Sequence, residues 1–182
     1  MKRLIERVII TEQQIRQRVE EMIVEIARDF RGKDLVVVGI LKGSYIFLAD
    51  LTRLMYRYNL NPQVDFTILS CYGNSTAPST MIKIDRDVSV AVTGKAVLVV
   101  DDIMDTGRTM QYVNARMQWL QPEIIRTCVL LDKPSRREVE VIADYIGFTV
   151  EDHFYVGYGL DYQGFYRERP YIAALEGLEE EK

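Results

Sequence analysis

The stretch VLVVDDIMDTGRTM, residues 97–110, places four apolar residues directly before two adjacent carboxylates, Asp101 and Asp102. A third carboxylate, Asp105, follows on a predicted turn, and Thr-Gly-Arg-Thr at 106–109 leads into a helical pattern. An apolar run of this kind is typical of a strand buried on both faces of a parallel sheet. In such sheets ligands bind at the carboxyl ends of the strands. The stretch therefore predicts a strand, a turn and a helix that together carry a ligand site.

The turn and the acids suit different parts of one ligand. Free N–H groups at the start of a helix, with the positive end of its dipole, bind phosphate. Gly107 lets the backbone approach the anion closely, and Thr106 and Thr109 add hydroxyl donors. The adjacent carboxylates suit the cis-diol of a ribose or a hydrated Mg²⁺ ion. A ribose 5-phosphate has both features. Helix capping is the alternative explanation, but capping needs one carboxylate and three lie here within five residues.

Apolar runs and helical periodicities alternate on both sides of this stretch. Thr11 and Gln14 form a predicted capping box before the first helix. We expect helices over residues 11–32, 43–58 and 107–120, and strands over 35–40, 64–70, 96–101, 126–131, 145–148 and 154–156. The segment that follows the second strand has loop composition, and loops of this length are usually functional or mobile. The alternation predicts an α/β fold with a parallel sheet wrapped by helices.

The composition sets limits on the kind of protein. A chain of 182 residues is most simply one domain. Its net charge of -4 gives no electrostatic reason to expect nucleic acid as the main partner. Cys71 and Cys128 lie far apart, and His153 is the single histidine, which disfavours a zinc cluster. With no signal-peptide pattern and no apolar run of membrane-spanning length, we expect a cytoplasmic protein that is not bound to a membrane.

The stretch at 97–110 resembles the phosphoribosyl pyrophosphate signature of type I phosphoribosyltransferases. Five further motifs resemble hypoxanthine-guanine phosphoribosyltransferases in the same order: LKGS at 41–44, SCYG at 70–73, LLDKPSRRE at 130–138, DYIGF at 144–148 and VGYGLDY at 156–162. The resemblance extends from about Val8 to Tyr171. It implies a single domain over 1–182 with a central, mostly parallel sheet flanked by helices. A small hood from the N- and C-terminal segments is expected over the active site.

The resemblance also implies a reaction. In that family a 6-oxopurine base displaces pyrophosphate from phosphoribosyl pyrophosphate and gives a nucleoside monophosphate. Asp101 and Asp102 match the acidic pair that holds the ribose hydroxyls, directly or through Mg²⁺, and Asp161 matches a second carboxylate associated with Mg²⁺. Asp105 matches the residue proposed as general base for the purine nitrogen N7. The backbone from Met104 to Thr109, including Arg108, matches the cradle of the 5'-phosphate.

Other residues match the base and pyrophosphate contacts of the family. Lys133 matches the lysine that donates to the purine 6-oxo group, and Phe154 matches the aromatic residue that stacks on the base. The backbone of Tyr155 would contact the purine edge. Arg167 matches an arginine that binds pyrophosphate. Lys42 and Gly43 match the pyrophosphate loop, where a strained or cis peptide is expected.

A lid and three departures complete the comparison with the family. The segment from Cys71 to Ile82 matches a flexible lid, with Tyr72 expected at its closed seam. Asp101 stands where many relatives carry Glu, Cys71 replaces a common serine and Tyr155 replaces a common valine. The change at Tyr155 makes the preference among hypoxanthine, guanine and xanthine the least determined part of the inference. We expect a homodimer or homotetramer.

Two other functions use similar acidic motifs. Pyrimidine-operon attenuation proteins share the fold and a similar acidic stretch, but act mainly by binding RNA. Asp105 supplies a base where those regulators typically lack a carboxylate, and Lys133 with Phe154 indicates an oxopurine pocket. A response-regulator receiver domain also has paired acids at a strand end, but it needs a further phosphoacceptor aspartate and a shorter chain. Salvage of a purine base is therefore the predicted function.

Overall fold

A six-stranded central sheet organises the computed structural model, which describes residues 5–72 and 81–177. Its strands lie in the spatial order β4 (Met81–Arg86), β3 (Gln63–Tyr72), β2 (Leu35–Leu41), β5 (Ala96–Met104), β6 (Ile124–Asp132) and β7 (Tyr145–Thr149). The strands are parallel except for the antiparallel pair of β3 and β4 at one edge. The predicted α/β fold with a mostly parallel sheet is therefore confirmed.

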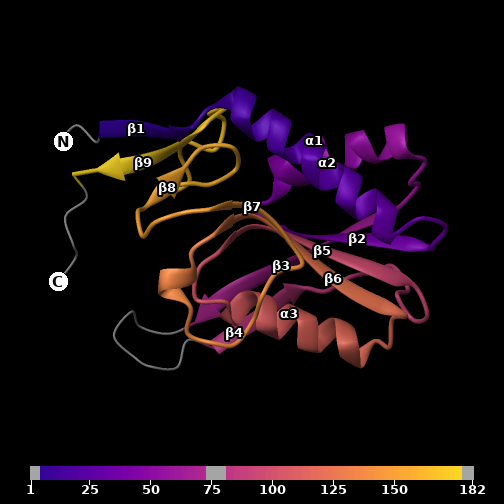
Figure 1. Cartoon of the computed structure of the whole chain (residues 1–182). Coiled ribbons are helices and arrows are strands. Elements are labelled where there is room, and N and C mark those ends of the chain that lie inside the picture. The colour runs from indigo at the N-terminus through magenta and orange to yellow at the C-terminus, as the bar shows by residue number, and fades with distance from the viewer. Residues whose placement is uncertain (1–4, 73–80, 178–182) are drawn as a thin grey trace.

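Helices cover both faces of this sheet (Figure 1). Helices α1 (Glu12–Asp29) and α2 (Tyr45–Met55) lie on one face, and α3 (Arg108–Trp119) lies on the other. Two short 3₁₀ helices, η1 (Tyr56–Tyr58) and η2 (Pro134–Arg136), follow α2 and β6. The helix expected over 43–58 is thus an α-helix that tightens into a 3₁₀ turn. No helix in the described part of the chain is long and apolar enough to cross a membrane.

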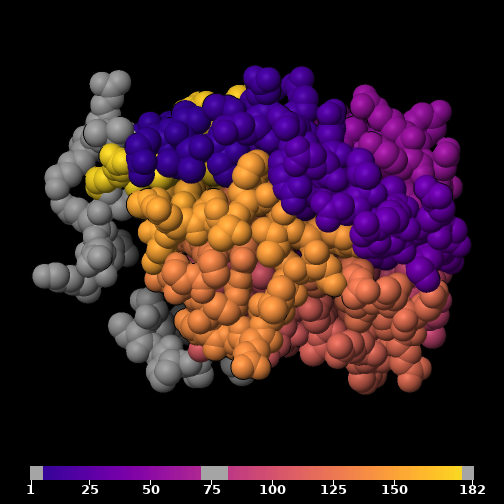
Figure 2. All heavy atoms as spheres, viewed as in Figure 1, coloured from indigo at the N-terminus to yellow at the C-terminus, as the bar shows by residue number. Residues whose placement is uncertain are grey.

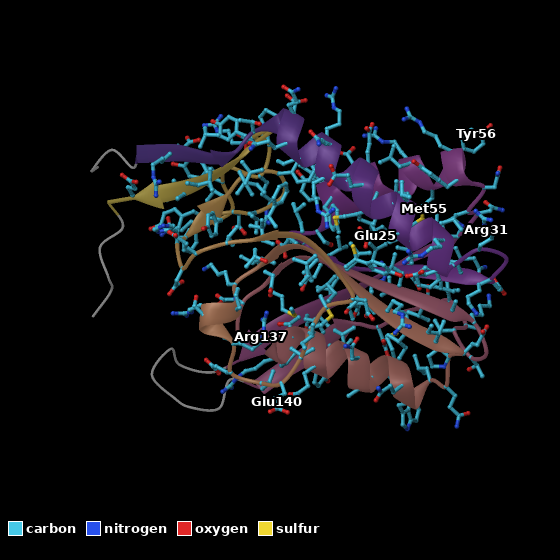
Figure 3. The ribbon with its side chains drawn as sticks, viewed as in Figure 1. Glu25, Arg31, Met55, Tyr56, Arg137 and Glu140 are labelled. Carbon is cyan, nitrogen blue, oxygen red and sulfur yellow. The ribbon has the colours of Figure 1, made fainter. Side chains whose placement is uncertain are left out.

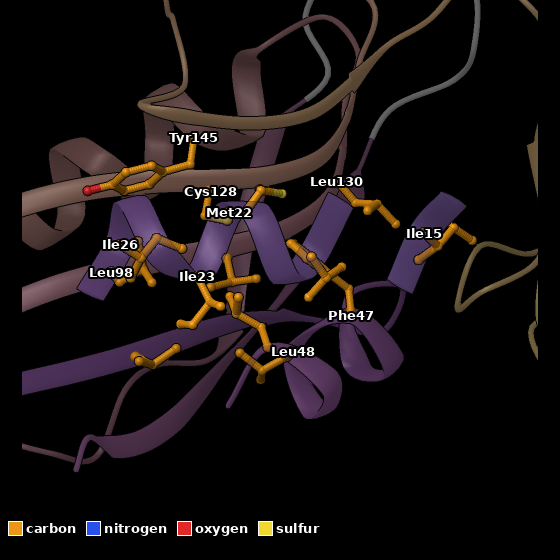
Figure 4. Close-up of a cluster of buried hydrophobic side chains, with 14 of the residues drawn as sticks. Ile15, Met22, Ile23, Ile26, Phe47, Leu48, Leu98, Cys128, Leu130 and Tyr145 are labelled. Atoms are coloured by element: carbon orange, nitrogen blue, oxygen red, sulfur yellow. The ribbon is translucent and has the colours of Figure 1, made fainter. Parts of the chain in front are cut away.

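Helix α1 forms where the sequence predicts it. The Thr11 hydroxyl accepts a hydrogen bond from the N–H of Gln14, and the Gln14 side chain accepts one from the N–H of Thr11, which is the predicted capping box. The apolar face of the helix packs on α2 and on the sheet (Figure 4). The side chains in this contact include Ile15, Met22, Ile23 and Ile26 from α1, Phe47 and Leu48 from α2, and Leu98, Cys128 and Leu130 from the sheet.

The central strands are buried on both faces. Leu35, Val37 and Leu98 belong to the hydrophobic cluster under α1 and α2, whereas Val36 and Val97 belong to the cluster under α3. Alternate residues of a strand point to opposite faces, so both sets must be apolar. This burial explains the continuous apolar runs in the sequence. Since Gly39 is the register partner of Val100, the ends of β2 and β5 meet at the same edge of the sheet.

A second, three-stranded sheet forms the predicted hood. It has the order β1 (Ile5–Ile10), β9 (Ile172–Glu176) and β8 (Tyr155–Val156), and both pairings are antiparallel. The first and last described segments of the chain therefore lie side by side (Figure 1). Figure 2 shows the N-terminal residues, in indigo, packed directly against the orange residues of the C-terminal third. Hood and core form one continuous surface on this face.

The loop expected from Cys71 to Ile82 is shorter than predicted. Strand β3 continues to Tyr72, and an unpredicted strand, β4, begins at Met81 and pairs with it. Residues 82–85 of this strand, IKID, alternate apolar and charged residues, as an edge strand with one covered face does. The proximity of loop-forming residues concealed this short alternation. Residues 73–80, which contain the middle of the expected lid, lie outside the described residues.

Candidate active site

A cavity of about 310 Å³ lies at the carboxyl ends of β2 and β5. It is lined by residues 40–43, Leu69, 101–107, Thr109 and Met110. Nine of the residues that the sequence assigns to substrate, Lys42, Gly43, Asp101, Asp102, Met104, Asp105, Thr106, Gly107 and Thr109, therefore surround one space. Of the 101–109 stretch, Arg108 does not line it, because its side chain pairs at 2.7 Å with Glu138. The parallel register of the two strands brings these segments together.

The turn between β5 and α3 exposes main-chain donors. Gly107 is the N-cap residue of α3. Its φ of 82° is a backbone conformation that residues with a side chain rarely adopt. The N–H groups of Asp105, Thr106 and Gly107 donate to no group within residues 5–72 and 81–177. Amides at a helix start are suited to an anion. The turn therefore has the donor arrangement that the sequence predicts for a phosphate.

Asp101 of the acidic pair is buried, and Asp102 is partly buried. Asp101 is 6% exposed, and burial, followed by the charge of Asp102, raises its pKa well above the ordinary value. Burial also raises the pKa of Asp102, although hydrogen bonds and the nearby Arg167 oppose the rise. Each carboxylate accepts the N–H of the next residue, at 3.0 Å and 2.8 Å. A cation beside two acids with raised pKa values would stabilise their ionised forms. Mg²⁺ prefers oxygen ligands such as these carboxylates. The pair fits the metal that the family implies.

Two glycines join the loop after β2 to the acidic pair and to the hood. A Cβ atom on Gly43 would lie 1.6 Å from Oδ2 of Asp102, and one on Gly159 would lie 2.0 Å from the carbonyl oxygen of Gly43. Gly159 has a φ of 102°. The peptide bond between Leu41 and Lys42 is cis, as expected from the resemblance. Main chain from the hood, main chain from the loop and the carboxylate of Asp102 are therefore stacked in direct contact.

Charged side chains gather beside Asp105. The ammonium of Lys133 lies 3.3 Å from Oδ1 of Asp152 and 4.0 Å from Oδ2 of Asp105, and its side chain is 8% exposed. Arg136 lies 3.3 Å from Asp105 and 3.6 Å from Asp152. The structure thus brings Lys133 and Asp105 together, as the sequence predicts. The Lys133 ammonium therefore lies between two carboxylates, and it has N–H donors for a polar ligand.

The two aromatic residues of the predicted base site differ in exposure. Phe154 is 44% exposed, and its ring meets the ring of Tyr162 edge-on at 5.5 Å. Tyr155 is buried, and its hydroxyl donates to the carbonyl of Glu151 at 3.0 Å. Burial raises the pKa of Tyr155. An exposed ring such as that of Phe154 is available to stack on a flat ligand.

Asp161 and Arg167 pair with each other. Nη2 of Arg167 lies 2.7 Å from Oδ1 of Asp161, and Nη1 donates to the carbonyl of Gly159 at 2.5 Å. The Asp161 side chain also accepts the N–H of Gly164 at 2.7 Å. Among the described residues no group of three or more metal-ligating side chains is assembled. The roles assigned to Asp161 and Arg167 therefore stay predictions, as does the lid, because the Cys71 and Tyr72 side chains lie outside the described residues.

Sequence reasoning missed three charged residues of this region, Arg136, Arg137 and Asp152. The two arginines follow Lys133 in the motif LLDKPSRRE, and Asp152 precedes Phe154 by two residues. Their closeness to residues already assigned was the one available signal. Their contacts depend on how the ends of β6 and β7 approach each other, which a local pattern does not report.

Comparisons with known proteins agree with this geometry. The model of the phosphoribosyl transferase domain matches residues 9–163. The chain is 41% identical to the hypoxanthine phosphoribosyltransferase of Escherichia coli (strain K12), over 99% of this chain and 100% of that protein. It is 42% identical to the hypoxanthine-guanine phosphoribosyltransferase of Aquifex aeolicus, over 93% of this chain and 94% of that protein.

A longer relative and a solved structure extend the comparison. The chain is 40% identical to the bifunctional protein TilS/HprT of Listeria monocytogenes and spans 26% of its length. A crystal structure of a hypoxanthine-guanine phosphoribosyltransferase from Bacillus anthracis matches with a TM-score of 0.86 at 37% identity, covering 95% of this chain and 99% of that one. The chain therefore belongs to the phosphoribosyl transferase family, among its hypoxanthine-guanine phosphoribosyltransferases.

Proposed function

We propose that this protein transfers the 5-phosphoribosyl group of phosphoribosyl pyrophosphate to hypoxanthine or guanine, giving IMP or GMP and pyrophosphate. The observation that carries the proposal is one cavity where Asp101, Asp102 and Asp105 meet three turn amides that donate to no group in the described part of the chain. The amides of the turn hold the 5'-phosphate, and Asp101 and Asp102 hold the ribose hydroxyls. The alternative of an RNA-binding regulator is not favoured, since the full-length relatives named above are transferases.

The residues divide the chemistry between them. The bond between C1' and pyrophosphate breaks as the purine nitrogen bonds to C1', with positive charge developing on the sugar. Asp105 accepts the proton from N7 of the base, and Lys133 donates to the 6-oxo group. Phe154 stacks on the purine, and the backbone of Tyr155 contacts its edge. Lys42, Gly43 and Arg167 bind the departing pyrophosphate. Asp101, Asp102 and Asp161 would hold Mg²⁺, which would supply positive charge to neutralise the pyrophosphate.

Lys133 gives the selection for oxopurines a physical basis. Its ammonium has three N–H donors and no acceptor, and two of its neighbours are carboxylates. A 6-oxo group accepts a hydrogen bond from it, whereas the 6-amino group of adenine would place N–H donors against the N–H donors of the ammonium. We further expect a cytoplasmic homodimer or homotetramer, as the resemblance implies.

Steady-state assays with the Asp105→Asn variant test the proposal. Wild-type protein should form IMP from hypoxanthine and phosphoribosyl pyrophosphate, and chelation of Mg²⁺ should stop the reaction reversibly. Asp105→Asn should lower kcat by about a hundredfold or more, the range of general-base contributions, with little change in the KM for phosphoribosyl pyrophosphate. Full turnover by this variant would refute the role of Asp105. Tight binding of leader RNA without IMP formation would instead favour the regulator.

A further inference from the structure

The carbonyl groups of the phosphate turn are held from behind by one neighbouring segment. The carbonyl of Met104 accepts the N–H of Lys133 at 3.0 Å, and the carbonyl of Thr106 accepts the N–H of Glu138 at 3.0 Å. The carbonyl between them, that of Asp105, accepts from the side chain of Arg137 at 2.6 Å. Three consecutive carbonyls therefore bond to residues 133–138.

Arg137 is the side chain that joins these contacts. Its Nη1 donates to both the Asp105 and the Met104 carbonyls, the latter at 3.1 Å, and its Nη2 donates to the carboxylate of Asp132. The Arg137 side chain is 16% exposed and that of Asp132 is 10% exposed. Arg137 lies between η2 and the start of α3 (Figure 3). A planar guanidinium with several fixed donors suits such a set of acceptors.

The direction of the carbonyls decides the direction of the amides. In a trans peptide the N–H points opposite to the C=O. The N–H groups of Asp105, Thr106 and Gly107 belong to the three peptides whose carbonyls are held, so they face away from residues 133–138. The cavity linings agree with this direction, since residues 105–107 line the cavity that contains Asp102, whereas Arg137 lines a different cavity with Val139 and Val141.

Packing supports the same contact. A Cβ atom on Gly107 would lie 2.9 Å from Cδ of Arg137, 2.5 Å from Val141 and 3.1 Å from Val139. The stem of Arg137 therefore fills the space left by the missing side chain of Gly107. Both ends of the arginine, stem and guanidinium, fix the turn from the side opposite the ligand.

We propose that Arg137 is a positioning residue, which binds the turn carbonyls so that the amides of Asp105, Thr106 and Gly107 point at the 5'-phosphate. The inference rests on the proposed function, because it assigns that phosphate to the turn. It separates Arg137 from Arg136, which contacts the carboxylates of Asp105 and Asp152 rather than the turn backbone. Since Arg137 does not touch the ligand, it affects affinity through the main chain.

The test compares two ligands that differ in the 5'-phosphate alone. Inhibition constants of IMP and of inosine are measured for wild type and for Arg137→Met, which keeps the apolar stem and removes the guanidinium. Because this change leaves Asp132 buried without its partner, the double variant Arg137→Met/Asp132→Asn is measured beside it. Arg126→Met is the control, because Arg126 pairs with Asp144 at the opposite end of β6.

Both Arg137 variants should bind IMP about tenfold more weakly or worse, the effect of losing charge-assisted hydrogen bonds, while inosine changes by less than about twofold. The KM for phosphoribosyl pyrophosphate, which carries the same 5'-phosphate, should rise together with the inhibition constant of IMP. Arg126→Met should change neither constant. An equal loss for IMP and inosine, no loss for either, or failure of both variants to fold would overturn the inference. A wild-type protein that forms no IMP would refute the proposed function instead.

Discussion

The ammonium of Lys133 lies 5.5 Å from the centre of the Tyr155 ring, on its face. The same ring meets His153 edge-on at 6.1 Å, and its hydroxyl bonds to the Glu151 carbonyl. Tyr155 therefore packs against the lysine that we assign to the 6-oxo group. We therefore expect the Tyr155 side chain to support Lys133 from the interior of the protein.

Replacing Tyr155 should separate the effect of the ring from that of the hydroxyl. A buried cation–π contact contributes about 2 kcal/mol, so Tyr155→Val should lower kcat/KM for hypoxanthine by up to about thirtyfold without changing the KM for phosphoribosyl pyrophosphate. Tyr155→Phe keeps the ring and should retain activity within about threefold, with stability lowered by about 1 kcal/mol from the lost hydrogen bond. Equal losses in both variants would argue against support of Lys133 by the ring.

Removing the ammonium should change base selection. Lys133→Met should lower kcat/KM for hypoxanthine by about a hundredfold, because a charge-assisted hydrogen bond to the base is lost. The much lower kcat/KM for adenine should not fall. The ratio of kcat/KM for hypoxanthine to kcat/KM for adenine should therefore decrease by about a hundredfold. Steady-state assays with both bases measure this ratio. Retention of the wild-type ratio would remove Lys133 from base recognition.

A methyl group on Gly43 should disable the site while leaving the fold intact. The added Cβ would lie 1.6 Å from Oδ2 of Asp102, so either the loop or the carboxylate must move. We expect Gly43→Ala to lower kcat/KM by about a hundredfold or more, since displacement of about 1 Å at an active site has effects of that size. Gly94→Ala is the matched control: its Cβ meets nothing within 4 Å, and its φ of 71° should reduce stability alone. Circular dichroism and thermal melting would show whether both variants are folded.

Asp65 should make stability depend on pH outside the active site. Burial opposes its ionisation, but N–H groups of Val90, Phe66 and Ser89, with the Ser89 hydroxyl, outweigh burial and lower the pKa of Asp65. A lowered pKa in the folded state stabilises the protein above the unfolded-state pKa of about 3.9, and this contribution is lost as the pH falls through the folded-state value.

Asp65→Asn should therefore lower the free energy of unfolding by about 2 kcal/mol at neutral pH, with a smaller difference from wild type below about pH 4. Urea unfolding at several pH values measures this. The exposed Asp34, 3.6 Å from Lys95, provides the control, because Asp34→Asn should cost less than about 1 kcal/mol. A difference that stays constant with pH would exclude ionised Asp65 as the cause.

The parts of the molecule that local pattern determines could be predicted from sequence. The buried strands β2, β5 and β6 can be recognised in the sequence as apolar runs, because helices cover both of their faces. Helix α1 has its cap and its periodicity in the chain. Strand β4 was missed because it lies at the edge of the sheet and depends on β3 for its hydrogen bonds.

The site was predictable to the extent that one segment carries it. Asp101 to Thr109 lie on a single strand, turn and helix, so adjacent residues report the chemistry. The contact between Arg137 and the Asp105 carbonyl, and that between Lys133 and Asp152, join segments 32 and 19 residues apart. Such pairs depend on where the strands end in space, and no periodicity encodes that.

The stack of Gly159, Gly43 and Asp102 also constrains how this enzyme can be assembled and altered. Gly159 packs on the carbonyl of Gly43, and Gly43 packs on the carboxylate of Asp102, so neither glycine has room for a side chain. Because Gly159 comes late in the chain, a protein truncated before it would leave the Gly43 loop without this contact. Side chains around this contact can therefore vary, but any residue larger than glycine at position 43 or 159 would displace its neighbour.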